Sequence, residues 1–178
     1  MYNEFPVIET ERLRLRLITE KDLKEMFSIY SSEEVMKYYG IYPINDISTV
    51  EVMIEKFKES FEVDMGIRWG IELKSTSKLI GTCGYHNWNK RHFRAEIGYE
   101  LGNEFWRKGY AKEAISSIIK YGFDEMNLER IEALVYPENE TSENMLKKLG
   151  FLHEGYLRKY VYFRDKHQDL NMFSLTKD

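Results

Sequence analysis

The chain has 178 residues, 43% of them hydrophobic, which suits one well-packed domain better than two. Its 26 basic and 30 acidic residues leave a formal net charge of −4, so it lacks the broad positive surface that binds nucleic-acid phosphates. Cys83 is the only cysteine, which excludes an intramolecular disulfide, and no Cys/His cluster suggests a metal site.

The N-terminal segment lacks the basic and apolar regions of a signal peptide, and no apolar run reaches the roughly 18 residues of a membrane span. We therefore expect a cytoplasmic protein without a membrane partner.

Leucines alternate with arginines over residues 7–19, which predicts one half-buried strand. Thr19 followed by Asp22 is similar to a capping box and predicts a helix over about residues 20–31. Helical spacing of apolar residues predicts a second helix over 48–63.

Strands dominate the middle of the chain. Two strand-like runs, residues 67–74 and 78–86, are separated by a polar turn and predict a hairpin. A third run over 94–101 is expected to pair with them. The spacing of the apolar residues then changes from that of a strand to that of a helix, and a wide apolar stripe from Gly109 to Met126 predicts an amphipathic helix. The chain ends with a predicted strand over 130–136 and a short helix over 142–149 that Gly150 terminates. A final pair of strands is predicted over 156–163 and 170–176.

The loop before the long helix is the most informative segment. Gly109 and Ala111 are small enough for a ligand to approach the backbone. The first turn of a helix offers unpaired N–H groups and a partial positive charge, which suit an anion such as pyrophosphate. Arg107, Lys108 and Lys112 oppose the helix dipole there, so a bound polyanion would compensate them. The alternative is a solvated basic cluster that costs little.

Several segments in order resemble the Gcn5-related N-acetyltransferase family, in its branch of ribosomal-protein N-terminal acetyltransferases. The loop Trp106-Arg107-Lys108-Gly109-Tyr110-Ala111 is similar to the family's acetyl-CoA motif Gln/Arg-x-x-Gly-x-Gly/Ala, with tryptophan in the first place. The resemblance continues in Ile8-Glu9-Thr10-Glu11-Arg12-Leu13, Ala95-Glu96-Ile97-Gly98-Tyr99-Glu100-Leu101, Asn139-Glu140-Thr141-Ser142, Lys148-Leu149-Gly150-Phe151 and Asp169. It therefore covers nearly the whole chain, which we expect to be one N-acetyltransferase domain over residues 1–178.

The resemblance implies a mixed α/β fold with a mostly antiparallel, splayed sheet of about seven strands and about four helices. Its fourth and fifth strands would part to admit the pantetheine arm of acetyl-CoA, the co-substrate. Backbone groups of Glu100, Leu101 and Gly102 would lie along that arm, and Asn139 and Ser142 would meet it from the next segment. The pyrophosphate would be cradled by Trp106, Arg107, Lys108, Gly109, Tyr110, Ala111 and Lys112.

Acetyl transfer by direct attack needs a neutral amine and no metal, so the site requires a base that deprotonates the amine and an acid for the leaving thiolate. Glu96 and Glu100 are four residues apart on a strand and share a face. By resemblance Glu96 is the candidate base, with a structural ion pair as its alternative, and Glu100 is a weaker candidate. Ser142 matches the acid of an Asn-x-x-Ser motif, although serine is also a common helix N-cap. His86 has the chemistry of a base but is more often a surface residue.

Two family positions differ in this chain. Leu146 stands where many members have a tyrosine acid, and Val161 where the ribosomal branch has a glutamate base. These differences leave a non-catalytic CoA-binding module as the rival hypothesis. The acceptor is a primary amine, either a protein N-terminus or a small molecule, and the sequence leaves a homodimer open.

Overall fold

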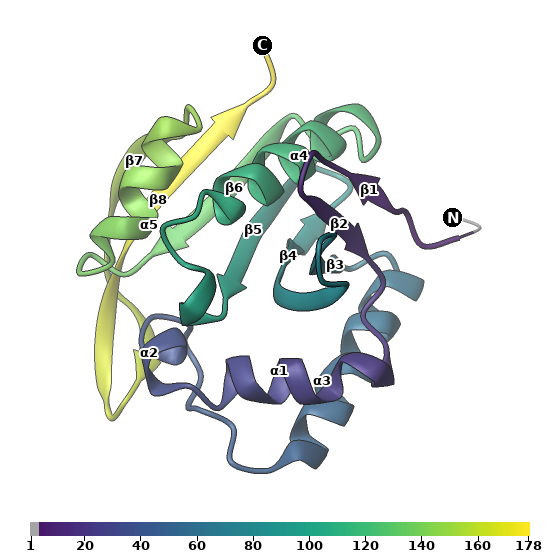
Figure 1. Cartoon of the computed structure of the whole chain (residues 1–178). Coiled ribbons are helices and arrows are strands. Elements are labelled where there is room, and N and C mark those ends of the chain that lie inside the picture. The colour runs from purple at the N-terminus through teal and green to yellow at the C-terminus, as the bar shows by residue number, and fades with distance from the viewer. Residues whose placement is uncertain (1–3) are drawn as a thin grey trace.

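The strand patterns assemble into one eight-stranded sheet in the order β1-β2-β3-β4-β5-β6-β8-β7 (Figure 1). The computed structural model describes residues 4–178. Residues 1–3 lie outside the described residues, although they belong to the expected domain and to the N-terminal segment discussed above. Neighbouring strands are antiparallel except β5 and β6, which are parallel. The strands are β1 (Ile8–Glu9), β2 (Leu13–Arg16), β3 (Ile67–Leu73), β4 (Lys78–Asn89), β5 (Arg94–Leu101), β6 (Arg130–Val135), β7 (Leu152–Phe163) and β8 (Lys166–Thr176).

Helices cover both faces of the sheet. Figure 1 shows the N-terminal helices gathered below the sheet and the later helices along its upper and left parts. They are α1 (Leu23–Tyr30), α2 (Glu33–Met36), α3 (Ile47–Glu62), α4 (Tyr110–Asp124) and α5 (Glu140–Lys148), with short 3₁₀ turns η1 (Glu20–Asp22) and η2 (Asn103–Phe105). Between residues 4 and 178, no helix has both the length and the apolar character required to cross a bilayer.

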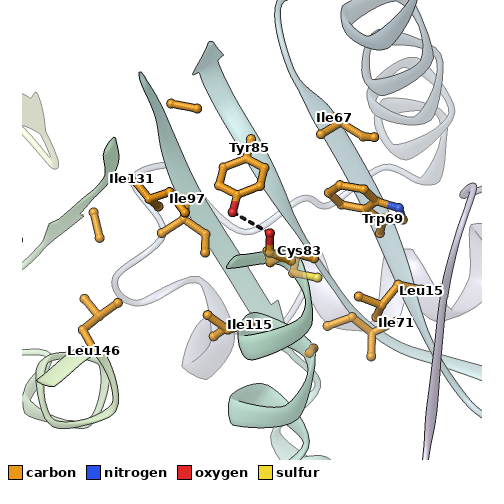
Figure 2. Packing of buried hydrophobic residues seen from close by; sticks show 14 of the residues in the cluster. Leu15, Ile67, Trp69, Ile71, Cys83, Tyr85, Ile97, Ile115, Ile131 and Leu146 are labelled. Atoms are coloured by element: carbon orange, nitrogen blue, oxygen red, sulfur yellow. Dashed lines mark hydrogen bonds between the residues drawn. The ribbon is translucent and has the colours of Figure 1, made fainter. Parts of the chain in front are cut away.

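Two hydrophobic cores lie on opposite faces of the sheet. Leu79 packs with α1 and α3, whereas its neighbour Ile80 packs with the strands and α4, because successive strand residues point to opposite faces. Figure 2 shows Ile115 of α4 and Leu146 of α5 directed towards the same set of strand side chains. Cys83 lies in this core, and burial raises the pKa of its thiol to about 12, so it is no reactive nucleophile.

The expected mixed, splayed α/β fold is confirmed, with one correction at the start and one at the end. Residues 7–19 do not form a single strand, because Thr10 makes a turn: its N–H donates to the carbonyl of Leu13 (2.9 Å), and its hydroxyl oxygen accepts from the amide of Leu13 (3.0 Å). The last two strands are longer than expected and meet at a two-residue turn, Arg164 and Asp165, where both φ angles are positive (54° and 58°). The one-turn helix α2 was not predicted.

Candidate active site

The parallel pair β5 and β6 separates after only three residue pairs. Its register runs from Arg94 opposite Arg130 to Glu96 opposite Glu132 and then stops. Beyond that point residues 97–101 of β5 pair only with β4, and residues 133–135 of β6 pair only with β8. The fourth and fifth strands expected from the sequence therefore do part, and an elongated ligand can reach peptide groups between them.

Backbone hydrogen bonds show which residues of β5 face this split. The carbonyl of Phe93 accepts from the amides of residues 129 and 130, on the β6 side. The amide of Gly102 donates to the carbonyl of Ile80, on the β4 side (2.9 Å). Because the peptide groups of a strand alternate in direction, odd-numbered residues of β5 direct theirs towards the split.

This alternation sorts the backbone positions expected to meet the pantetheine arm. Tyr99 and Leu101 direct their amides into the split, whereas the peptide groups of Glu100 and Gly102 face β4. The carbonyl of Leu101 already accepts the indole N–H of Trp106 (2.8 Å), so its amide is the group left for a ligand. Trp106, which the resemblance includes in the pyrophosphate cradle, thus directs its indole N–H to the end of β5 and holds the loop between β5 and α4.

A cavity of about 400 Å³ opens beside the split. Its walls are aromatic, from Tyr38, Tyr39 and Phe57 on the side of the N-terminal helices to Tyr136 after β6. The sequence-predicted residues Glu96, Asn139 and Ser142 all line it, together with His86 and Arg68. The cavity therefore combines aromatic side chains with polar and charged groups, which a substrate site needs to enclose and orient a ligand.

Glu96 and His86 face each other across β4 and β5. Their Cα atoms are register partners, and Nε2 of His86 lies 3.0 Å from Oε1 of Glu96. Asn87 donates to the other carboxylate oxygen (3.0 Å). Burial by itself raises the pKa of Glu96, but hydrogen bonds from His86 and Asn87 and the charge of Arg94 outweigh it, so the pKa lies below its usual value. Glu96 is consequently ionised at neutral pH and orients the imidazole.

Gly98 provides the space for this arrangement. A Cβ atom at this position would lie 3.0 Å from Nη1 of Arg68 and 3.3 Å from Cε1 of His86. The imidazole therefore lies over the backbone of Gly98, with Nδ1 close to the same point. His86 was the less favoured sequence candidate, and only its cross-strand position next to Glu96 distinguishes it from a surface histidine.

Glu100 shares the strand face of Glu96 but lies in a closed network. Its side chain is 4% exposed and forms an ion pair with Arg68, whose side chain is 10% exposed. The carboxylate also accepts hydrogen bonds from Thr82 and from the hydroxyl of Tyr30 (2.5 Å), and Arg68 reaches Tyr39 (3.2 Å). With both oxygens occupied, the Glu100 side chain fixes the cavity wall and neutralises Arg68.

Glu100→Gln is expected to lower the free energy of unfolding by about 3 kcal/mol, because it leaves the buried guanidinium of Arg68 without its counter-charge. Chemical denaturation measures this loss. Glu51→Gln, on the exposed surface of α3, is the matched control and should leave stability unchanged. A Glu100→Gln protein with unchanged stability but no turnover would instead assign a direct chemical role to Glu100.

Ser142 lies in the first turn of α5 and does not cap it. The N-cap is Asn139, whose Oδ1 accepts the amide of Ser142 (3.2 Å). The Oγ of Ser142 lies 2.6 Å from the hydroxyl of Tyr99, a tyrosine that the sequence reasoning did not select. Leu146, at the position of the family's tyrosine acid, is fully buried, and Figure 2 shows it directed into the core. Leu146 therefore supplies no proton donor to the cavity.

The loop before α4 presents unpaired donors and cations. Gly109 is the N-cap and has a φ of +81°, in the left-handed region that favours glycine. The amides of residues 110–112 have no acceptor within residues 4–178, as expected for a first helical turn. Arg107, Lys108 and Lys112 form no ion pair with any of the described residues. The basic cluster thus has the geometry of an anion site.

The N-terminal hairpin holds this loop in position. Glu113, in the first turn of α4, accepts hydrogen bonds from the hydroxyl of Thr10 (2.7 Å) and the amide of Arg12 (2.8 Å), and it forms an ion pair with the Arg12 guanidinium (2.7 Å). Arg12 also donates to the carbonyl of Lys108 (2.9 Å) and lies over the ring of Tyr110. This explains why an early motif accompanies the loop, although about a hundred residues separate them.

Comparisons with known proteins agree with this geometry. A model of the GNAT acetyltransferase domain matches residues 12–152. The chain is 44% identical to YoaA of Bacillus subtilis, described as an uncharacterized N-acetyltransferase, over 97% of this chain and 98% of that protein. It is 25% identical to the ribosomal protein uS5-alanine N-acetyltransferase of Escherichia coli, over 95% of this chain and 90% of that one.

Solved structures show the same architecture. A GNAT-family acetyltransferase from Bacillus anthracis superposes with a TM-score of 0.85 and 28% identity, over 96% of this chain and 98% of that chain. Spermidine N-acetyltransferase from Vibrio cholerae, solved with CoA and spermine, superposes with a TM-score of 0.82 over 94% of this chain and 96% of that chain. At 23% identity the second likeness is one of fold.

Proposed function

This chain belongs to the GNAT acetyltransferase family, and on that premise we propose that it transfers the acetyl group of acetyl-CoA to a primary amine held in the aromatic cavity. The family and the named relatives make it an acetyl-CoA-dependent acyltransferase. The observation that carries the assignment of the site is the separation of β5 from β6 after Glu96, directly beside the cavity.

The described residues suit acetyl-CoA in two places. Around the start of α4, the amides of the first turn and the cations Arg107, Lys108 and Lys112, which form no ion pair within residues 4–178, suit the pyrophosphate. In the split, the amides of Tyr99 and Leu101 and the Nδ2 of Asn139, which has no partner within residues 4–178, suit the polar pantetheine arm. An amide directed at the thioester oxygen would stabilise the charge that develops there.

The amine is deprotonated on the other side of the cavity. We assign proton acceptance to Nδ1 of His86, while the ionised Glu96 holds the Nε2–H of the same ring. Glu96 also attracts the incoming ammonium group. The neutral amine then forms a C–N bond to the acetyl carbon, and the C–S bond breaks with its electron pair leaving on the sulfur, next to Ser142. The nitrogen, cationic after the attack, gives its surplus proton to this thiolate, so the amide is neutral and CoA leaves as a thiol. Glu100 acts through the cavity wall that it fixes with Arg68.

Protein N-termini and small amines both remain acceptors in this proposal. One relative is named for ribosomal protein uS5 alanine, and one structural neighbour for spermidine. We further propose that residues 1–178 form one catalytic domain, because both cores pack on the same sheet, and that it acts in the cytoplasm. A homodimer is compatible with these assignments.

Acetyl-CoA is expected to raise the melting temperature of the protein, and thiol release is expected to depend on an added amine. A panel of N-terminal peptides followed by small amines identifies the acceptor class. Binding of acetyl-CoA without amine-dependent thiol release across the panel would contradict catalysis and favour a CoA-binding module. Absence of any thermal shift at saturating acetyl-CoA would contradict the assignment of the split and the α4 loop.

A further inference from the structure

Tyr99 and Ser142 form a pair of hydroxyl groups that spans the split. Tyr99 belongs to β5 and Ser142 to α5, and their oxygens are 2.6 Å apart. Both side chains line the cavity. Within residues 4–178 neither hydroxyl has another hydrogen-bond partner. The pair therefore has two protons but uses only one of them internally, so one O–H has no acceptor in the protein.

The chemistry of the two groups decides which proton is free. A phenol is a stronger donor than an aliphatic alcohol, and the alcohol oxygen is the better acceptor. Tyr99 therefore donates to Ser142, and the O–H of Ser142 is the group without an acceptor. Burial raises the pKa of Tyr99 to about 12, although the hydrogen bond with Ser142 by itself lowers it, so Tyr99 remains a protonated donor at any physiological pH.

The backbone around Ser142 fixes the direction of this donor. The amide of Ser142 is held by the side chain of Asn139 at the start of α5 (3.2 Å). The hydroxyl is held by Tyr99, whose own strand packs against the core. A donor that is preorganised in this way loses little freedom when a charged acceptor arrives, and the hydrogen bond that it receives polarises it further.

We propose that Tyr99 is a positioning residue whose hydroxyl orients and polarises Ser142 as a hydrogen-bond donor to the sulfur that leaves acetyl-CoA. The inference rests on the proposed function. When the C–S bond breaks, the electron pair stays on sulfur as a thiolate, and the amine proton has gone to His86. Ser142 then stabilises the thiolate by a hydrogen bond, and the Tyr99 proton stays on Tyr99 because a phenol is a weaker acid than a thiol.

The first test compares turnover in four proteins. Ser142→Ala is expected to lower kcat by about 10- to 100-fold, the usual worth of a hydrogen bond to a charged group. Tyr99→Phe is expected to lower kcat about five-fold, with the KM for acetyl-CoA unchanged, through lost orientation and polarisation. The double variant should match Ser142→Ala within about two-fold, because Tyr99 acts through Ser142. Ser142→Thr keeps the hydroxyl and should restore turnover.

The second test uses the resting protein and free CoA, without turnover. A thiol ionises near about pH 8.5, so CoA affinity should rise about ten-fold for the wild type between neutral and alkaline pH as the thiolate forms. This rise should disappear in Ser142→Ala and weaken in Tyr99→Phe, and desulfo-CoA should show none of it. His86, Glu96 and Arg68 in the same cavity are unchanged in these variants and affect all curves alike. Tyr162→Phe, at the exposed end of β7, is the matched control.

The outcomes separate this inference from the proposed function. Wild-type protein that neither binds CoA nor releases thiol would overturn the proposed function. Wild-type protein that does both, with Tyr99→Phe equal to it in kcat and in the pH dependence of CoA affinity, would overturn the role of Tyr99. Fully additive losses in the double variant would also overturn it, because they would mean that Tyr99 acts independently of Ser142.

Discussion

Gly109→Glu is expected to abolish acetyl-CoA binding, with an affinity loss of at least about 100-fold, or roughly 2.7 kcal/mol. Gly109 is the N-cap of α4, and its backbone is left-handed with a φ of +81°. A carboxylate there would place negative charge beside the free amides that we assign to the pyrophosphate. A Cβ atom would also lie 3.3 Å from Nη2 of Arg12, which holds the loop. Calorimetry with acetyl-CoA measures the loss.

Gly150→Glu is the matched control for this prediction. Gly150 also has a positive φ, of +91°, but it ends α5 far along the chain from the α4 loop. The control introduces the same side chain into the same class of backbone strain, so it should reduce stability without reducing acetyl-CoA affinity. Gly109→Asn, which tolerates the left-handed region and adds no charge, should keep most of the affinity. If Gly109→Glu bound acetyl-CoA with wild-type affinity, the assignment of the phosphate site would be wrong.

The second large effect is expected at the proton-accepting pair. Glu96→Gln and His86→Asn should each lower kcat by about 100-fold, the lower end of what general base catalysis contributes. The double variant should be no worse than either single variant, because Glu96 acts by orienting His86. Acetyl-CoA affinity should be unchanged in all three, since neither side chain is among the groups that we assign to acetyl-CoA.

An amine that is already uncharged at neutral pH tests the reason for this loss. Such an acceptor needs no base, so the variants should approach wild-type turnover with it. Because the pKa of Glu96 is lowered, its carboxylate is ionised well below neutral pH, and Glu96 should add no titration step to the pH profile near neutrality. An equal loss with charged and uncharged amines would contradict proton acceptance and leave Glu96 and His86 as structural residues.

Local patterns in the sequence determined most of the fold. The alternation over 94–101 and the helical stripe after Gly109 reproduce β5 and α4 almost to the residue, because each element buries one face and its period records which face. The family resemblance, rather than this periodicity, selected Glu96, Asn139 and Ser142, and all three line the cavity. The alternation of leucines and arginines did not reveal that β1 and β2 are separate strands. The turn at Thr10 changes the phase, so Ile8 packs on the core from an even position and Leu13 and Leu15 pack on it from odd ones.

Local patterns in the sequence predicted most of the helices and strands, their buried faces and the basic loop before α4. The tertiary structure alone decided the partners: His86 for Glu96, Arg68 for Glu100, Tyr99 for Ser142. The hydrophobic periodicity of a segment indicates which face of a helix or strand a side chain occupies. It does not indicate which side chain of another element lies opposite. Strand register and helix docking set that choice, and they result from packing the whole chain rather than from any local pattern.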